Sequence, residues 1–483
     1  MGFLAFFIYI AGILGLVSRS TSIVILASFI IIGLISNDFS YFKKTPSFLY
    51  TFKAIFKKEN KLELIFVSLL LLFIFFNLFR NFTPPTDNDS IAAYLSIPKW
   101  FVLKGEIYPI NTTVWDNTPQ YTQMLSVVGL TFDSIYLPQL LTGWVTGILG
   151  ALLTYLLEKE LKLSRKHALM AALIFYISPT ILWINATNKT DLLWTVFDLS
   201  AFYIFFKFIY TKEKLTYNSF YFILIGILLG FGFGTKYQTL LTISIILILL
   251  FYKIYNYHKT NYSLILKNTI YYSFLIGIMM LLISSPNLLK NLSQHNNPLF
   301  PLFDKMEVLS SNTKNTDHLA DTNYIGKILS FFIGKNYFIT KNIIFNAQAF
   351  GGIVLCLIPF SFLSKFNKKY SVTFLLIFFL YASGMILIQP PYPRHVLPSL
   401  GFLSIISSVG FFYIYNNFQK IKYPLLVLTI MSLLFHAENR IKSFINNDWN
   451  YFTGKESKTE YLTRMVYSKQ GHPNAEITNY INN

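Results

Sequence analysis

The 483-residue chain is predicted to be an all-α polytopic membrane protein, a bundle of about 13 transmembrane helices with two long extracytoplasmic loops. Three observations predict this fold class: 54% of the residues are hydrophobic and only 13% are charged, the apolar runs reach helical spanning length, and basic residues fall in alternate loops. A span needs about 20 apolar residues. This composition excludes a soluble enzyme and, despite the net charge of +18, a nucleic-acid-binding module. A β-barrel is excluded because its strands would alternate in polarity.

The predicted spans lie near residues 2–17, 21–36, 62–79, 136–157, 168–185, 191–210, 219–234, 237–255, 268–289, 343–363, 372–388, 397–415 and 424–436. Basic residues concentrate in cytoplasmic loops. Here they gather in one alternating set of loops, at Lys43, Lys44, Lys53, Lys57, Lys58, Lys61, Lys159, Lys162, Arg165, Lys166, Lys212, Lys214, Lys259, Lys267, Lys365, Lys368, Lys369, Lys420 and Lys422. The N-terminus is therefore predicted to be cytoplasmic. No cleaved signal is expected, because no basic region precedes the first apolar stretch.

The opposite set of loops contains two long segments, about 80–135 and 290–342, and both are predicted to face outward. They belong to a transmembrane catalytic module, residues 1–436, which is followed by a short extracytoplasmic tail, 437–483. Long loops in compact proteins are usually functional. The protein is therefore expected in an inner or plasma membrane, with its active site on the extracytoplasmic face.

Two aspartates in the first long loop are candidate bases. Asp87 and Asp89 follow the Pro84–Pro85 pair, and the residues after them predict an amphipathic helix along the membrane interface, with Tyr94 and Trp100 at headgroup depth. Such a helix would hold a carboxylate over a lipid substrate. The alternative is that both aspartates are solvated loop acids.

The segment DSIAAYLSIPKWFVLKGEIYP, residues 89–109, resembles the first external loop of the GT-C glycosyltransferases, in particular bacterial relatives of protein O-mannosyltransferase and of the lipid A aminoarabinose transferase. Four further segments resemble this superfamily in the same order: NKTDLL (188–193), GFGFGTKY (230–237), NLSQHNNPLFPLF (291–303) and PYPRHVLP (391–398). Two departures stand out. Ala93 and Tyr94 replace the Tyr-His pair of many members, so no histidine role carries over, and the short tail puts an acceptor-binding role of a C-terminal soluble domain in doubt.

The resemblance implies a sugar donor linked to polyprenyl phosphate, in which the phosphate leaves as an anion, so one base is sufficient for inverting transfer of a hexosyl or pentosyl group. Asp89 is the first candidate and Asp87 the second. Lys236 and Arg394 are candidates for binding the donor phosphate, since both are cations at outer turns and fixed charge stabilises a developing anion. The alternative for Lys236 is that its long side chain only extends (snorkels) to the membrane–water interface and binds no phosphate.

The remaining candidate substrate-binding residues are Tyr94, Asp191, Tyr237, His295 and His395. Asp191 has the alternative role of complementing a helix dipole, and His295 that of a polar loop residue. No cofactor is expected. Asp87 and Asp89 could share a divalent ion, although no ligand spacing supports a metal site. The expected partners are the lipid-linked donor, an extracytoplasmic acceptor and the bilayer, with no nucleic acid.

Two other functions stay open: an O-antigen polymerase or ligase, and a lipid or polysaccharide transporter. A transporter should place charge within its spans, and Asp198 is the clearest such charge here. Asn-x-Ser/Thr triplets such as those at Asn81, Asn111, Asn188 and Asn291 are attributed to an asparagine-rich composition rather than to glycosylation. Cys356 is the only cysteine, so no intrachain disulfide forms.

Overall fold

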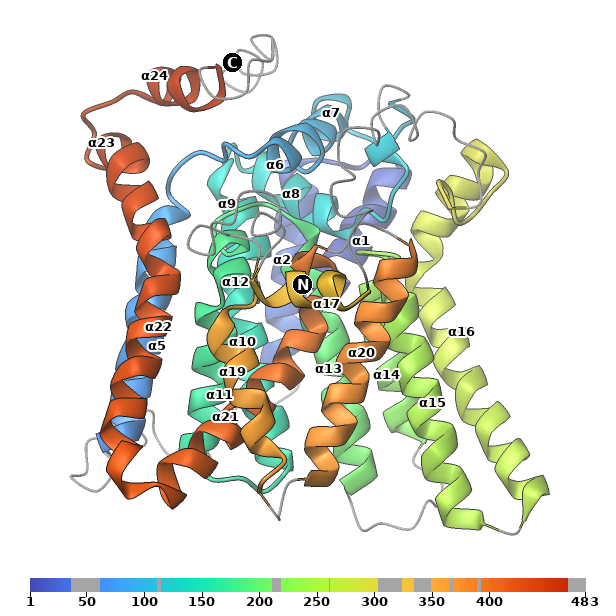
Figure 1. The fold of residues 1–483 in the computed structure, drawn as a ribbon. Helices are drawn as coiled ribbons and strands as arrows, with labels where there is room; N and C mark the ends of the chain where they lie inside the picture. The colour runs from blue at the N-terminus through green and yellow to red at the C-terminus, as the bar shows by residue number, and fades with distance from the viewer. Residues whose placement is uncertain are drawn as a thin grey trace.

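A computed structural model describes residues 1–35, 61–110, 114–210, 219–259, 261–302, 324–333, 349–364, 368–388 and 392–467. Within these ranges all regular secondary structure is helical, and long helices run side by side between two ends of the molecule (Figure 1). The predicted all-α bundle is confirmed. Several residues used to predict orientation lie outside the described ranges, namely Lys43, Lys44, Lys53, Lys57, Lys58, Lys212, Lys214 and Lys365, as does most of the second long loop.

The helices preceding the middle of the chain are α1 (Gly2–Ile13), α2 (Arg19–Ile35), α5 (Lys61–Arg80), α6 (Asn88–Ala92), α7 (Ser96–Lys104), η2 (Val114–Asp116), α8 (Tyr121–Thr131), α9 (Tyr136–Gln139), η3 (Leu140–Val145), α10 (Thr146–Glu160), α11 (Arg165–Ile177), α12 (Pro179–Ile184) and α13 (Thr190–Tyr210). The later helices are α14 (Ser219–Phe233), α15 (Thr239–His258), α16 (Tyr262–His295), α17 (Tyr324–Ile333), α19 (Gly352–Ser361), α20 (Lys368–Ile388), η7 (Pro393–Val396), α21 (Leu397–Asn417), η8 (Gln419–Ile421), α22 (Lys422–Ser443), η9 (Phe444–Asp448), α23 (Trp449–Phe452), α24 (Lys458–Leu462) and η10 (Thr463–Tyr467).

Eight helical segments in the described part of the chain are long and apolar enough to cross a membrane: Lys61–Arg80, Tyr136–Glu160, Thr190–Ile209, Thr239–His258, Tyr262–His295, Tyr370–Leu387, Pro393–Asn417 and Gln419–Phe452. Four shorter apolar helices, α1, α2, α14 and α19, accompany them. A multi-pass membrane protein is therefore confirmed, whereas a total of about 13 spans stays a prediction.

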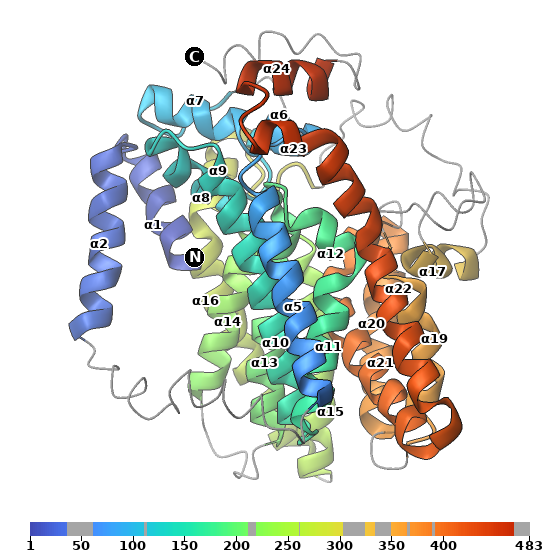
Figure 2. The same cartoon turned by 90° about the vertical axis from the view of Figure 1, so that its left-hand side faces the viewer.

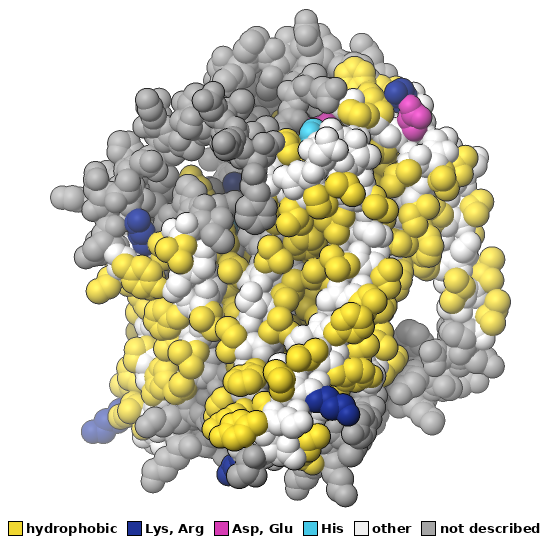
Figure 3. Space-filling model, turned by 90° about the vertical axis from the view of Figure 1, so that its right-hand side faces the viewer, with side chains coloured by type: hydrophobic (Ala, Val, Ile, Leu, Met, Phe, Trp, Pro, Cys, Tyr) yellow, Lys and Arg dark blue, Asp and Glu magenta, His cyan; other side chains and the backbone are white. Residues whose placement is uncertain are grey.

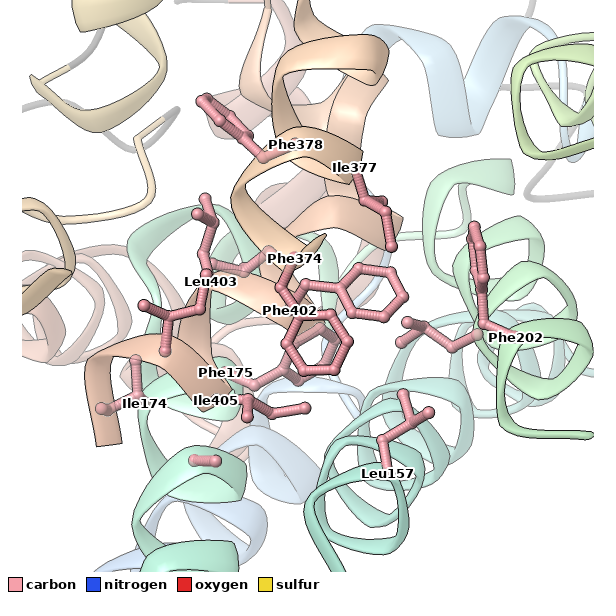
Figure 4. Packing of buried hydrophobic residues seen from close by; sticks show 14 of the residues in the cluster. Leu157, Ile174, Phe175, Phe202, Phe374, Ile377, Phe378, Phe402, Leu403 and Ile405 are labelled. Atoms are coloured by element: carbon pink, nitrogen blue, oxygen red, sulfur yellow. The ribbon is translucent and has the colours of Figure 1, made fainter. Parts of the chain in front are cut away.

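The main hydrophobic core surrounds α21, which packs against α11, α19 and α20. The spanning window of α21 is 94% buried. Its Phe402 contacts Phe202 of α13 and Phe374 of α20, with ring centroids 4.9 and 5.0 Å apart (Figure 4). Lipid chains are as apolar as these side chains, so close packing rather than water exclusion holds such helices together.

The outer flank of the bundle is apolar as well. Ile270, Phe274 and Leu281 of α16 are exposed, as a lipid-facing surface requires. Figure 3 shows a broad hydrophobic band over one flank, with lysine and arginine side chains at its lower edge. The turns from α15 to α16 and from α21 to α22, which carry Lys259 and Lys420, lie at the end opposite α6 and α7 (Figure 1).

The first long loop forms two short helices, α6 and α7, where the sequence predicts one amphipathic helix. Ile91, Ile97 and Phe101 are buried, whereas Trp100 and Leu103 are exposed. Pro84 and Pro85 separate these helices from the end of α5, because proline lacks the N–H that would continue the helix. The loop therefore lies on the bundle as an ordered layer that fixes the position of Asp87 and Asp89.

The last spanning helix is longer than the sequence suggests. α22 continues to Ser443, beyond the predicted end at residue 436, and η9 and α23 follow without a break. α24 then lies beside α6 and α7 (Figure 2), and its Tyr461 and Leu462 form a small buried cluster with Ile91 of α6. The described part of the C-terminal segment thus supports the loop that carries the two aspartates.

Candidate active site

Four segments that are far apart in the sequence bring their charged residues together at one end of the bundle. Asp87 is the N-cap of α6, and its carboxylate accepts a hydrogen bond from the Ser90 backbone N–H at 3.1 Å. Asp89 lies in the first turn of the same helix. The cations that reach these carboxylates come from the segment between α12 and α13 and from η7.

Asp89 contacts two cations through the same oxygen. Arg394 Nη1 donates to Asp89 Oδ2 at 2.8 Å, and Lys189 Nζ lies 3.2 Å from that oxygen. In the described part of the chain no hydrogen bond or ion pair reaches Asp89 Oδ1. The side chain is 34% exposed. Among the described residues, one oxygen of Asp89 is therefore held by two cations and the other has no partner.

The two cations determine the charge of this carboxylate. Burial alone would raise the pKa of Asp89, but the charges of Lys189 and Arg394 and their hydrogen bonds outweigh it, so the pKa of Asp89 lies below its ordinary value. Asp89 is consequently ionised at neutral pH. The lowered pKa keeps Asp89 ionised but makes it a weaker base than an ordinary aspartate.

A second ion pair lies alongside the first. Lys236, in the turn between α14 and α15, places Nζ 2.6 Å from Asp191 Oδ1, in the first turn of α13. Both side chains are largely buried, and the ammonium also lies over the Trp194 ring, 4.9 Å from its centroid. Burial lowers the pKa of Lys236, and Asp191 partly offsets that effect. Lys236 thus points into the protein.

Tyr94 lies between the two ion pairs. Its hydroxyl is 3.5 Å from Thr190 Oγ1, the residue before Asp191. Burial raises the pKa of Tyr94, and the charges of Asp191 and Asp89 raise it further. Tyr94 therefore stays a neutral hydroxyl that can donate a hydrogen bond.

Tyr237 and His295 belong to a neighbouring polar network. The Tyr237 hydroxyl donates to the Phe300 carbonyl at 3.1 Å and accepts from Asn291 Nδ2 at 3.3 Å, and burial raises its pKa to about 12. The His295 ring stacks on Phe300, with centroids 3.9 Å apart. Tyr237 adjoins Lys236 in sequence, but the contacts of this network do not include the Asp89 ion pairs.

His395 follows Arg394 in η7, and its backbone N–H donates to the Tyr392 carbonyl at 2.9 Å. The ring lies 5.5 Å from that of Tyr392. These contacts shape the turn that presents the Arg394 guanidinium. Arg394 Nε is buried and has no hydrogen-bond partner among the described residues.

Lys189 is the site residue that sequence analysis missed. It lies within the NKTDLL segment, yet no role was expected for it. Its Nζ lies 2.9 Å from Asp87 Oδ1 as well as near Asp89, and its side chain is only 4% exposed. Like Lys236 and Arg394, Lys189 is a cation at a predicted outer turn, against the positive-inside trend.

Asn188 is the second missed residue, and it fixes the segment that carries Lys189. Its side chain donates to the Tyr94 carbonyl at 2.9 Å and to Ser126 Oγ at 3.0 Å, and accepts from Thr142 Oγ1 at 2.8 Å. Its backbone N–H donates to Ser90 Oγ at 3.0 Å. Asn188 is fully buried, so this triplet is not a surface glycosylation site.

No group of three or more histidine, cysteine, aspartate or glutamate residues with the proximity of a metal site occurs among the residues that the structure describes. The carboxylates of Asp87 and Asp89, which sequence analysis considered as shared metal ligands, both contact the Lys189 ammonium instead.

Comparison with known proteins finds a matching family and solved structures with a similar fold. Residues 140–289 match the family described as dolichyl-phosphate-mannose-protein mannosyltransferase. The structure of ArnT from Cupriavidus metallidurans bound to undecaprenyl phosphate is similar, with TM-score 0.53 and 16% identity over 77% of this chain and 64% of ArnT. Its apo state gives TM-score 0.51 and 14% identity over 72% of this chain and 59% of ArnT. No curated protein sequence matches this chain.

The resemblance to GT-C membrane glycosyltransferases predicted from the sequence is confirmed by the family match and by the shared fold. The chain spans about three fifths of the length of ArnT. The matched family region contains Asn188, Lys189, Asp191 and Lys236, whereas Asp87, Asp89 and Arg394 lie outside it.

Proposed function

We propose that this protein is a membrane glycosyltransferase that moves a hexosyl or pentosyl group from a polyprenyl-phosphate donor to an extracytoplasmic acceptor. The acceptor presents a hydroxyl of a lipid, a glycan or a protein, and transfer inverts the anomeric centre. The fold shared with ArnT, for which an undecaprenyl-phosphate-bound structure exists, and the mannosyltransferase match support the donor class.

The observation that carries the proposal is the carboxylate oxygen Asp89 Oδ1, which has no partner among the described residues, beside the Arg394 guanidinium. Asp89 Oδ1 accepts the proton of the acceptor hydroxyl as its oxygen attacks the anomeric carbon. The bond from that carbon to the donor phosphate breaks on the opposite side, and the phosphate leaves as an anion. Arg394, whose side chain is 23% exposed beside Asp89, and Lys236 supply positive charge for the leaving phosphate.

The neighbouring groups orient the two substrates. Tyr94 donates a hydrogen bond from its neutral hydroxyl to the sugar or to the acceptor. Asp191 holds the Lys236 ammonium at 2.6 Å and offers its second carboxylate oxygen to a sugar hydroxyl. Tyr237, His295 and His395 flank this region and are proposed to contact the substrates at its edges.

Replacing Asp89 with asparagine tests the assignment, because the amide keeps the shape but cannot take a proton. The full chain in nanodiscs is given undecaprenyl phosphates that carry different radiolabelled sugars, with a cell-envelope extract as acceptor. Asp89→Asn should lower transfer by about 100- to 10,000-fold, and Asp87→Asn should lower it less. The matched control is Glu106→Gln, which removes a half-exposed acid of the same loop that pairs with Lys104.

Near-normal transfer by Asp89→Asn together with loss of transfer in Asp87→Asn would show that Asp87, not Asp89, is the base. Full activity in both variants would show that neither aspartate of this loop takes part in the reaction. The absence of transfer from every donor would count against the proposed function itself.

A further inference from the structure

The ammonium of Lys189 lies between the carboxylates of Asp87 and Asp89. Its Nζ is 2.9 Å from Asp87 Oδ1 and 3.2 Å from Asp89 Oδ2. On its remaining side it lies over the Trp183 ring, 4.3 Å from the centroid. With 4% of its side chain exposed, the ammonium has exchanged almost all of its water for two carboxylates and an aromatic face.

The backbone leaves this ammonium little freedom to move. Asn188, the preceding residue, contacts α6 through Ser90, the following loop through Tyr94 and α8 through Ser126. The helix that carries the aspartates and the segment that carries Lys189 are therefore held as one unit, and Lys189 Nζ has a fixed place relative to both carboxylates.

Asp87, the N-cap of α6, and Asp89, in its first turn, are two positions apart, and two such carboxylates repel each other when both are ionised. Proteins commonly resolve such repulsion with a divalent cation, which binds carboxylate oxygens directly. Here an ammonium contacts both carboxylates at hydrogen-bond distance, so the space that a bridging metal would need is filled by the chain itself.

We propose that Lys189 is a built-in counter-cation, a positioning residue that takes the place of a divalent metal between Asp87 and Asp89. Its ammonium contacts both carboxylates and holds Asp89 Oδ2 in place, so Asp89 Oδ1 faces the substrate. For its catalytic consequence the proposal rests on the proposed function, since Asp89 is the base there. Removal of the ammonium should turn a metal-independent carboxylate pair into a metal-binding one.

Mn²⁺ is a suitable probe, because binding removes the electron paramagnetic resonance signal of the free ion and needs no enzymatic activity. Lys189→Met keeps the length of the side chain and removes its charge. Full-length Lys189→Met should bind Mn²⁺ at least tenfold more tightly than the wild type, and its thermal unfolding temperature should rise with Mn²⁺. Lys189→Arg, which keeps the charge, should behave like the wild type, and Lys189→Met/Asp87→Asn should lose the gained affinity.

Equal Mn²⁺ affinity of the wild type and Lys189→Met would overturn the proposal. If Lys189→Met does not fold, Lys189→Gln takes its place. A test without any Lys189 variant is also available: if the wild type binds Mn²⁺ and Asp87→Asn abolishes that binding, the proposal is overturned. In the transfer assay, EDTA should leave wild-type turnover unchanged, and Mn²⁺ should restore turnover to Lys189→Met. Absence of transfer in every sample would refute the proposed function, while the Mn²⁺ measurement still decides the role of Lys189.

Discussion

Asp89 keeps its negative charge in a partly dehydrated position because two cations offset the cost of burial. Arg394 contributes a hydrogen bond of 2.8 Å, and Lys189 contributes an ion pair of 3.2 Å. The pKa of Asp89 is therefore depressed in the folded protein. A depressed pKa means that the carboxylate is ionised above the ordinary pKa of aspartate, about 4, and loses its charge only when the pH falls through the still lower folded value.

The pH dependence of turnover follows from this shift. In the wild type at saturating donor, kcat should stay level as the pH falls toward about 4, the ordinary aspartate pKa. Arg394→Gln removes one stabilising charge, so the pKa of Asp89 should rise and the acid limb of the kcat profile should move to higher pH. The check is a pH–kcat profile, with Lys104→Gln, an exposed lysine of the same loop, as control. Identical profiles for the wild type and Arg394→Gln would show that Arg394 does not control the charge of the base.

Close helix packing positions the segment that carries Asn188 and Lys189. Gly143 lies in η3, where the carbonyl oxygens of Asn185 and Thr187 pass so closely that an added Cβ would lie 2.6 and 2.9 Å from them. Backbone atoms cannot rotate away as a flexible side chain could. The absence of a side chain at Gly143 therefore lets the segment before Asn188 lie against η3.

Gly143→Ala is expected to displace this segment. Overpacking should lower the free energy of unfolding of this variant by about 1–3 kcal/mol, so it should unfold at a lower temperature. Transfer should also fall, because Lys189 and Asp191 move with the segment. Thermal unfolding and the transfer assay measure both effects. Gly277→Ala is the matched control, since a Cβ there meets nothing within 4 Å and alanine favours a helix by about 1 kcal/mol. A Gly143→Ala variant as stable and active as Gly277→Ala would contradict this account of the packing.

At the scale of the whole molecule, the described charges divide between the two ends of the bundle. The ion pairs of Asp89 and Asp191 lie at the end where α6 and α7 are found, and the turns with Lys259 and Lys420 lie at the other (Figure 1). Basic residues favour the cytoplasmic side. The candidate site is therefore expected to face outward, where a lipid-linked donor and an envelope acceptor can meet.

Cysteine labelling tests this orientation. In a Cys356→Ala background, which removes the only native cysteine, an impermeant maleimide added to intact cells should label Lys104→Cys but not Lys420→Cys. Both lysines are exposed, so accessibility does not bias the comparison. After the cells are opened, both variants should react. Labelling of Lys420→Cys alone in intact cells would show that the topology is the reverse of the predicted one and that the candidate site faces the cytoplasm.

Helical structure in the first loop was predictable because its apolar spacing and the Pro84–Pro85 stop are local signals, although one helix was expected and two are present. It identified Asp87, Asp89, Lys236 and Arg394 as candidates, and the structure brings these four residues to one end of the bundle. It assigned no role to Lys189, since a lysine in a polar turn is inconspicuous until its partners are known. It also gave no sign that α24 packs on Ile91, because that contact joins residues about 370 positions apart.

The sequence by itself determined three things: that the chain is a helical membrane protein, which of its loops are acidic or basic, and which superfamily it resembles. It could do so because hydrophobic span length, loop charge and short motifs are properties of neighbouring residues. Only the tertiary structure decided which charges meet. Asp89 is paired with Arg394 across 305 positions, Lys189 rather than Lys236 lies between Asp87 and Asp89, and Lys236 is paired with Asp191. Burial makes an unpaired charge costly, so the packing of distant helices selects the ion pairs, and that packing cannot be deduced from spacing along the chain.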